Sequence, residues 1–105
     1  MSYITMSKIT LLEAKHLESM LHDYIDTVIH NINNSDRKHK FTYIGLWKHK
    51  PPVVVFSDSL FFDWSKQFDS VPPIEIIMRT DKLPPSVDKE YIEKMFMNET
   101  INHIY

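Results

Sequence analysis

The chain has no cysteine and only one glycine among its 105 residues. Without cysteine there is no disulfide, no thiol nucleophile and no thiolate metal ligand. The single glycine, Gly45, stands inside an apparent strand, whereas loops that cradle phosphate need several glycines with free backbone N–H groups. The sequence therefore argues against P-loop and dinucleotide-binding functions.

Long hydrophobic runs are also missing. Runs such as Val53–Phe56 and Leu60–Phe62 are far shorter than the roughly 20 apolar residues of a membrane-spanning helix. The first twelve residues lack the basic start and long apolar stretch of a secretory signal. We therefore expect a cytoplasmic protein without membrane contact. With 43% hydrophobic and 25% charged residues, the sequence predicts one globular domain spanning residues 1–105.

Charge is distributed unevenly along the chain. Residues 37–57 contain no acid and five cations, namely Arg37, Lys38, Lys40, Lys48 and Lys50. The part before this segment has two cations and five acids, and the part after it has five cations and nine acids. A basic, aromatic-rich middle between two acidic flanks favours a surface that binds a charged partner.

A long N-terminal helix is predicted over residues 11–32. Thr10 and Glu13 match a capping box, in which each side chain bonds the backbone N–H of the other residue. Apolar residues then recur at steps of three and four, as on one face of a helix: Leu17, Met20, Leu21, Tyr24, Ile25, Val28, Ile29 and Ile32.

The middle of the chain reads as a β-hairpin. Residues 41–47 and 53–56 are the predicted strands, and the prolines of the segment 48–52 mark the turn between them. Alternation places Phe41, Tyr43 and Trp47 on one face of the first strand. We expect Tyr43 and Trp47 to pack against the N-terminal helix.

Residues 58–69 are ambiguous between a short helix and an edge strand, and helical spacing of the aromatic residues favours the helix. A third strand is predicted over residues 74–79, and Asp88 is positioned to cap a terminal helix. The element order predicts the α+β class: a small three-stranded sheet, made of the hairpin plus one strand, packed by a long N-terminal helix and a C-terminal helix.

Metal binding has one weak candidate. His22, Asp26 and His30 follow one another at four-residue steps along the first helix, so neighbours lie within side-chain reach. The two histidines are nevertheless about 12 Å apart along the helix axis, and further ligands would have to come from elsewhere. We therefore expect a solvated polar stripe, no metal and no cofactor, and a metal-dependent hydrolase is the least favoured function.

Nucleic-acid binding is the main alternative to protein binding. The basic, aromatic hairpin of residues 37–50 supplies cations for phosphates, and Tyr43 and Trp47 are able to stack on bases. A straight strand, however, places Lys40 and Lys48 about 26 Å apart, so the two basic clusters do not form one stripe.

The leading hypothesis is a small non-catalytic protein that binds and neutralises a partner protein. Immunity proteins against bacterial toxins and phage-encoded inhibitors of host defence have this size, build and residue bias. The sequence leaves a homodimer open. The aromatic residue Phe62 is expected to point away from the other aromatic side chains of the predicted short helix and to be exposed for a partner. The predicted partner-binding residues are Trp47, Lys48, His49, Lys50, Asp58, Phe62 and Asp63; an acidic surface of Asp58, Asp63 and Asp69 is the alternative to the basic one.

Overall fold

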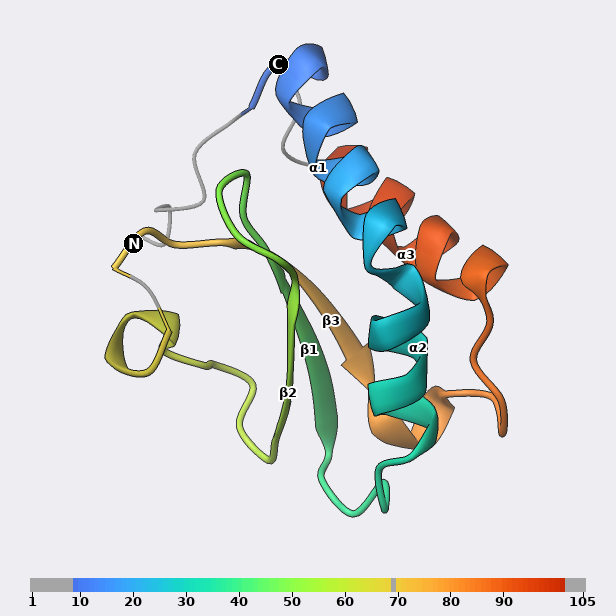
Figure 1. Cartoon of the computed structure of the whole chain (residues 1–105). Coiled ribbons are helices and arrows are strands. Elements are labelled where there is room, and N and C mark those ends of the chain that lie inside the picture. Colours follow the sequence, from blue (N-terminus) through green and yellow to red (C-terminus); the bar gives the residue numbers. More distant parts are fainter. Residues whose placement is uncertain (1–8, 69, 102–105) are drawn as a thin grey trace.

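The fold is a three-stranded antiparallel sheet with helices on one face and an irregular segment on the other (Figure 1). This computed structural model describes residues 9–68 and 70–101. The strands are β1 (Phe41–Leu46), β2 (Val53–Ser57) and β3 (Ile74–Arg79), in the spatial order β2-β1-β3. The α+β class and the three-stranded sheet are therefore confirmed.

The strand register joins distant parts of the chain. Phe41 is opposite Ser57 in β2 and opposite Arg79 in β3, and both pairings are antiparallel. The central strand β1 is thus paired along both edges, and the residues just before it lie beside the end of β3.

The predicted N-terminal helix is two helices, α1 (Leu11–Asp23) and α2 (Ile25–Asn33). The predicted capping box is present: the Glu13 N–H donates to Thr10 Oγ1 over 3.1 Å, and the Thr10 N–H donates to Glu13 Oε1 over 2.9 Å. The break falls at Tyr24, whose φ of −115° and ψ of 14° leave the helical region. No proline or glycine marks this position, so the apolar pattern, which runs through both helices, does not predict the break.

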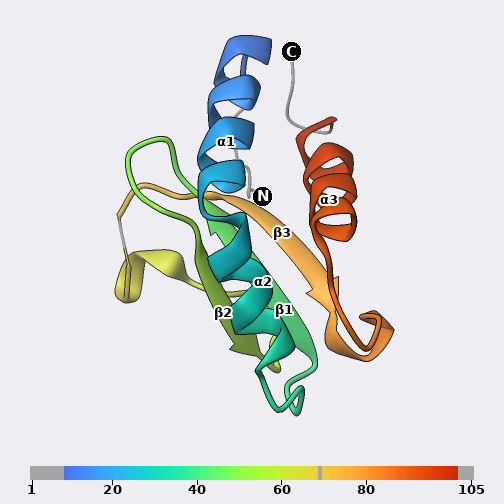
Figure 2. The ribbon, with the colours of Figure 1, turned by 45° about the vertical axis from the view of Figure 1, so that its right-hand side comes forward.

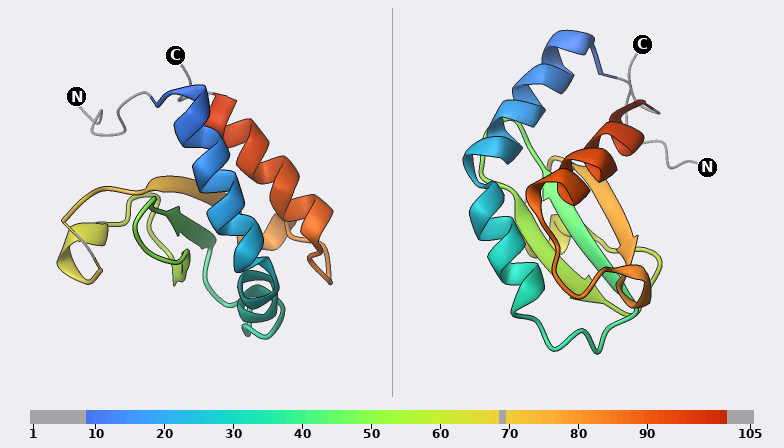
Figure 3. Two further views of the ribbon diagram at one scale, coloured as in Figure 1. Left: turned by 45° about the horizontal axis from the view of Figure 1, so that its top comes forward. Right: turned by 90° about the vertical axis from the view of Figure 1, so that its right-hand side faces the viewer.

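The main core lies between the sheet and the helices. It includes alternate residues of the strands, such as Ile44 and Ile76, together with buried residues of α1, α2 and α3 (Lys89–Ile101). Asp88 caps α3 as predicted, because its Oδ1 accepts from the Tyr91 N–H over 2.9 Å. Figures 2 and 3 show the three helices crossing the same face of the sheet.

A second, aromatic cluster lies on the opposite face of the sheet. Tyr43 and Trp47 are buried there against Trp64, so the expectation that they pack on the N-terminal helix is wrong. Strand alternation explains the correction, because Ile44 and Leu46 already point to the helices. Trp64 belongs to residues 58–68, which lie on this side of the sheet (Figure 3).

The helix predicted over residues 58–69 is reduced to one 3₁₀ turn, Trp64–Lys66. The aromatic residues of this segment do not form one face of a helix. They lie along an irregular backbone and pack ring against ring. Trp64 contacts Phe62 and Trp47 edge to face, with ring centroids 4.8 and 5.4 Å apart.

Candidate functional site

A hollow of about 700 Å³ opens at the end of the sheet where β1 begins and β3 ends. It is lined by Arg37, Lys38, His39, Lys40, Phe41, Leu60, Ile77, Arg79 and Asp81. Ligand sites typically have volumes of roughly 300–1,000 Å³. The lining combines four permanent cations with one carboxylate and three apolar side chains, so the hollow is basic with an apolar part.

The strand register assembles this lining. Because Phe41 pairs with Arg79, the basic segment before β1 lies beside the last residues of β3. Backbone pairing continues one step further, where the Thr80 N–H donates to the Lys40 carbonyl over 2.9 Å. Arg79 also pairs with Asp81 over 3.0 Å at the surface.

The basic segment is held by its own side chains. Arg37 has a φ of 55°, which is uncommon for a residue other than glycine. Its guanidinium donates to the Pro84 carbonyl over 2.6 Å and to the Pro85 carbonyl over 3.1 Å. These bonds offset the cost of the left-handed backbone, and they commit Arg37 to the fold more than to a ligand.

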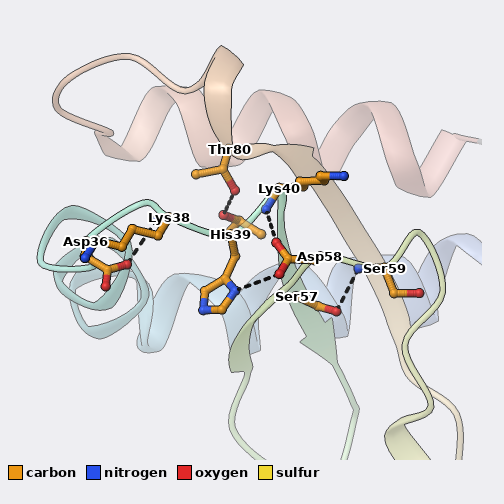
Figure 4. A network of polar contacts seen from close by, with 9 residues as sticks. Asp36, Lys38, His39, Lys40, Ser57, Asp58, Ser59 and Thr80 are labelled. Carbon is orange, nitrogen blue, oxygen red and sulfur yellow. Dashed lines mark hydrogen bonds and ion pairs between the residues drawn. The ribbon is translucent and has the colours of Figure 1, made fainter.

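Asp36 and Asp58 hold the backbone of Lys38 and Lys40 in place. The Lys38 N–H donates to Asp36 Oδ1 over 3.1 Å, and the Lys40 N–H donates to Asp58 Oδ1 over 3.0 Å. Asp58 also faces His39, with 3.6 Å between Oδ2 and Nδ1 (Figure 4). The lysine side chains therefore extend from a backbone that is already ordered.

Next to the hollow, Leu60 and Phe61 expose 71% and 78% of their surface. Their backbone is nevertheless fixed. The Phe61 N–H donates to Ser59 Oγ over 3.2 Å, and the Tyr43 hydroxyl donates to the Ser59 carbonyl. Burial raises the pKa of Tyr43, so this hydroxyl keeps its proton. Leu11 and Leu12 of α1 are also exposed, but Leu60 and Phe61 differ from them in lying at a charged hollow, and apolar anchors beside charged groups are common at interaction surfaces.

The structure places most predicted partner-binding residues in internal roles. Trp47 is only 2% exposed, and its indole donates to the Val71 carbonyl over 2.6 Å. Lys48 pairs with Glu13 over 2.7 Å, which lowers the pKa of Glu13. Lys50 lies 4.7 Å from the centre of the Trp47 ring, whereas His49 is exposed in the turn.

The remaining predicted residues also differ from expectation. Phe62 is half-buried in the aromatic cluster, so its predicted exposure is wrong, and Phe61 has the exposed position instead. Asp63 caps the 3₁₀ turn by accepting from the Ser65 N–H, and the Ser65 hydroxyl bond lowers the pKa of Asp63. Asp58 is used to position the basic segment, and Asp69 lies outside the described residues.

The weak metal candidate is not assembled. His22 faces Glu93 at 3.5 Å, Asp26 faces Lys89 at 4.0 Å, and His30 contacts Asn34 at 3.1 Å. Within residues 9–68 and 70–101, no three His, Asp or Glu side chains form a group able to hold a metal ion. No helix in the described part of the chain has the length and apolar character needed to cross a bilayer.

Sequence reasoning did not identify Arg79, Leu60 and Ile77 as neighbours of the basic segment. They come from separate elements, and only the register of β3 on β1 brings Arg79 and Ile77 to this end of the sheet. Comparison of this chain with protein-family models, curated proteins and solved structures finds no match.

Proposed function

We propose that this chain is a non-catalytic binding module that neutralises a partner protein by forming a one-to-one complex. The observation that carries the proposal is the exposed pair Leu60 and Phe61, held on an ordered backbone at the edge of the basic hollow. Interfaces derive much of their binding energy from a few apolar or aromatic anchors, surrounded by polar and charged groups that give specificity.

The biological setting we propose is inhibition inside a cell, by an immunity protein or by an anti-defence factor of a phage or mobile element. Such proteins act by occupying a surface of the target, which requires no catalytic group. A chain without cysteine suits the reducing cytoplasm.

Nucleic-acid binding through the hairpin is the second candidate, favoured by the basic hollow. Its aromatic platform, however, is covered: Tyr43 and Trp47 are packed beneath Trp64 and Phe62. Base stacking on Tyr43 and Trp47 would require Trp64 and Phe62 to leave this face of the sheet.

The test is recovery of the partner by a tagged chain expressed in its native cells, with the mass of the complex measured by light scattering. Phe61→Asp should raise the dissociation constant of the complex by about thirtyfold or more, and so reduce the recovered partner, since a hot-spot side chain contributes roughly 2 kcal/mol or more. Leu12→Asp is the matched control, because Leu12 is also 78% exposed but lies at the start of α1.

Three outcomes would contradict the proposal. The first is a complex that Phe61→Asp and Leu12→Asp weaken equally. The second is turnover of a substrate by the purified chain. The third is tight binding to generic DNA or RNA with an affinity that falls steeply as salt is raised.

A further inference from the structure

We infer that the basic hollow binds a short acidic segment of the partner protein, with one aliphatic side chain of that segment seated on Phe41, Leu60 and Ile77. This inference rests on the proposed function and specifies the partner chemistry. It follows from the charge, the apolar part and the order of the hollow.

Charge complementarity selects an acidic ligand. The lining holds four permanent cations and only Asp81 as an acid. Arg37 is bonded to the Pro84 and Pro85 carbonyls, and Arg79 is paired with Asp81, so Lys38 and Lys40 are the cations left to a ligand within the lining. Two ammonium groups on one short segment match two carboxylates spaced along an extended peptide.

The apolar part favours a peptide over a nucleic acid. Leu60 is exposed and Ile77 is half-exposed, and both line the hollow together with Phe41. Leu60 and Ile77 are aliphatic and receive another aliphatic side chain well, whereas single-stranded nucleic acids bind through aromatic stacking, and the one aromatic ring of the lining, Phe41, is partly buried beside Tyr43.

The hollow is ordered before binding. The backbone N–H groups of Arg37, Lys38 and Lys40 bond the side chains of Ser35, Asp36 and Asp58. A ligand therefore does not have to order this segment, which lowers the entropic cost of binding.

The direct experiment is an NMR titration of the whole chain with a blocked pentapeptide, in which a central leucine is flanked by two glutamates on each side. The amides of Lys38, His39, Lys40 and Ile77 should shift. Lys38→Glu with Lys40→Glu should raise the dissociation constant by about tenfold or more, since like charges then face the peptide. Lys15→Glu with Lys94→Glu changes the net charge equally on the exposed surfaces of α1 and α3, and should leave binding within about twofold.

Two altered peptides and an oligonucleotide separate the sources of affinity. Replacing the glutamates by glutamine should weaken binding because it removes the charges that face Lys38 and Lys40. Replacing the leucine by serine should also weaken binding because it removes the side chain that contacts the apolar part of the hollow. Oligothymidylate should bind more weakly than the acidic peptide at equal salt. Circular dichroism and thermal melting confirm that each variant is folded.

The inference is overturned if the glutamine peptide binds as well as the glutamate peptide, if the shifted amides lie elsewhere, or if oligothymidylate binds more tightly. It is also overturned if the acidic peptide causes no shift at low salt. The proposed function fails separately, because it depends on the intact partner and on Phe61→Asp against Leu12→Asp. A partner complex that survives Lys38→Glu with Lys40→Glu but is lost with Phe61→Asp would leave the proposed function standing and exclude this occupant.

Discussion

Gly45 lies where the structure leaves no room for even a methyl side chain. A Cβ atom at this position would lie 2.8 Å from Trp64 Cη2 and 3.1 Å from Trp47 Cη2. Trp64 is buried and its ring contacts those of Tyr43, Trp47 and Phe62, so it has little room to move. Gly45→Ala should therefore lower the free energy of unfolding by about 1–3 kcal/mol, measured by urea denaturation.

Trp64→Phe provides the control for this explanation. A smaller ring leaves space for the added methyl group, so the double variant should lose less stability than the two single changes added together. Additive losses would show that the cost of Gly45→Ala arises elsewhere in β1.

Glu75 should make the stability of the folded chain fall as the pH rises. Burial raises the pKa of Glu75 above 4.5, an effect that the bond from the Trp64 indole over 2.6 Å partly opposes. The folded state then holds a proton that the unfolded state has already released. This contribution is present below about pH 4.5 and is lost as the pH rises through the folded-state pKa.

Glu75→Gln keeps an oxygen that accepts from Trp64 and removes the charge. We expect this variant to be more stable than the parent near neutral pH and equal to it in acid, measured as urea midpoints across pH. Burial also raises the pKa of Glu99, with Glu75 as a second cause, so Glu99→Gln should act in the same direction. A parent whose excess stability over Glu75→Gln grows with pH would refute the assignment.

At the scale of elements, Asn33 joins the end of α2 to the segment that precedes α3. Its amide donates to the Val87 carbonyl over 3.0 Å, and its oxygen accepts from the Val87 N–H over 2.8 Å. Asn33→Ala leaves both buried backbone groups without this partner and should cost about 1–3 kcal/mol. Asn31→Ala, at an exposed position of the same helix, should change stability by less than about 0.5 kcal/mol, since exposed helix positions tolerate alanine.

The elements that could be predicted are those with local physical causes. The capping box of Thr10 and Glu13, the cap at Asp88 and the alternation of β1 each depend on residues that are close in sequence. The path of residues 58–68 could not be predicted in this way. It depends on Trp64, whose ring packs directly over Gly45 on the aromatic face of the sheet, and this contact has no signature in local spacing.

At the scale of the whole molecule, the two basic clusters have different electrostatic environments. The sequence correctly separated them, since they lie beyond opposite ends of β1 (Figure 1). It favoured the cluster after β1, whereas in the structure Lys48 is paired with Glu13 on α1 and Lys50 lies over the Trp47 ring. Glu13 and Lys48 are far apart in the sequence, and only the fold places α1 beside the turn that follows β1. The sequence therefore could not predict that Lys48 is paired with an acid.

This difference predicts how partner association depends on salt. Lys38→Ala and Lys48→Ala change the net charge by the same amount. If association depended on net charge alone, the two substitutions would slow it equally. The hollow, in contrast, gives Lys38 a cationic setting, whereas the field of Lys48 is largely cancelled by Glu13 at 2.7 Å. Lys38→Ala should therefore slow association several-fold at low salt and flatten the dependence of the rate on ionic strength. Stopped-flow or surface plasmon resonance measurements from about 20 to 300 mM salt would test this, since the Debye length shortens to below 10 Å across that range. If Lys48→Ala slowed association as much as Lys38→Ala, steering would belong to the net charge of the molecule and not to the basic hollow.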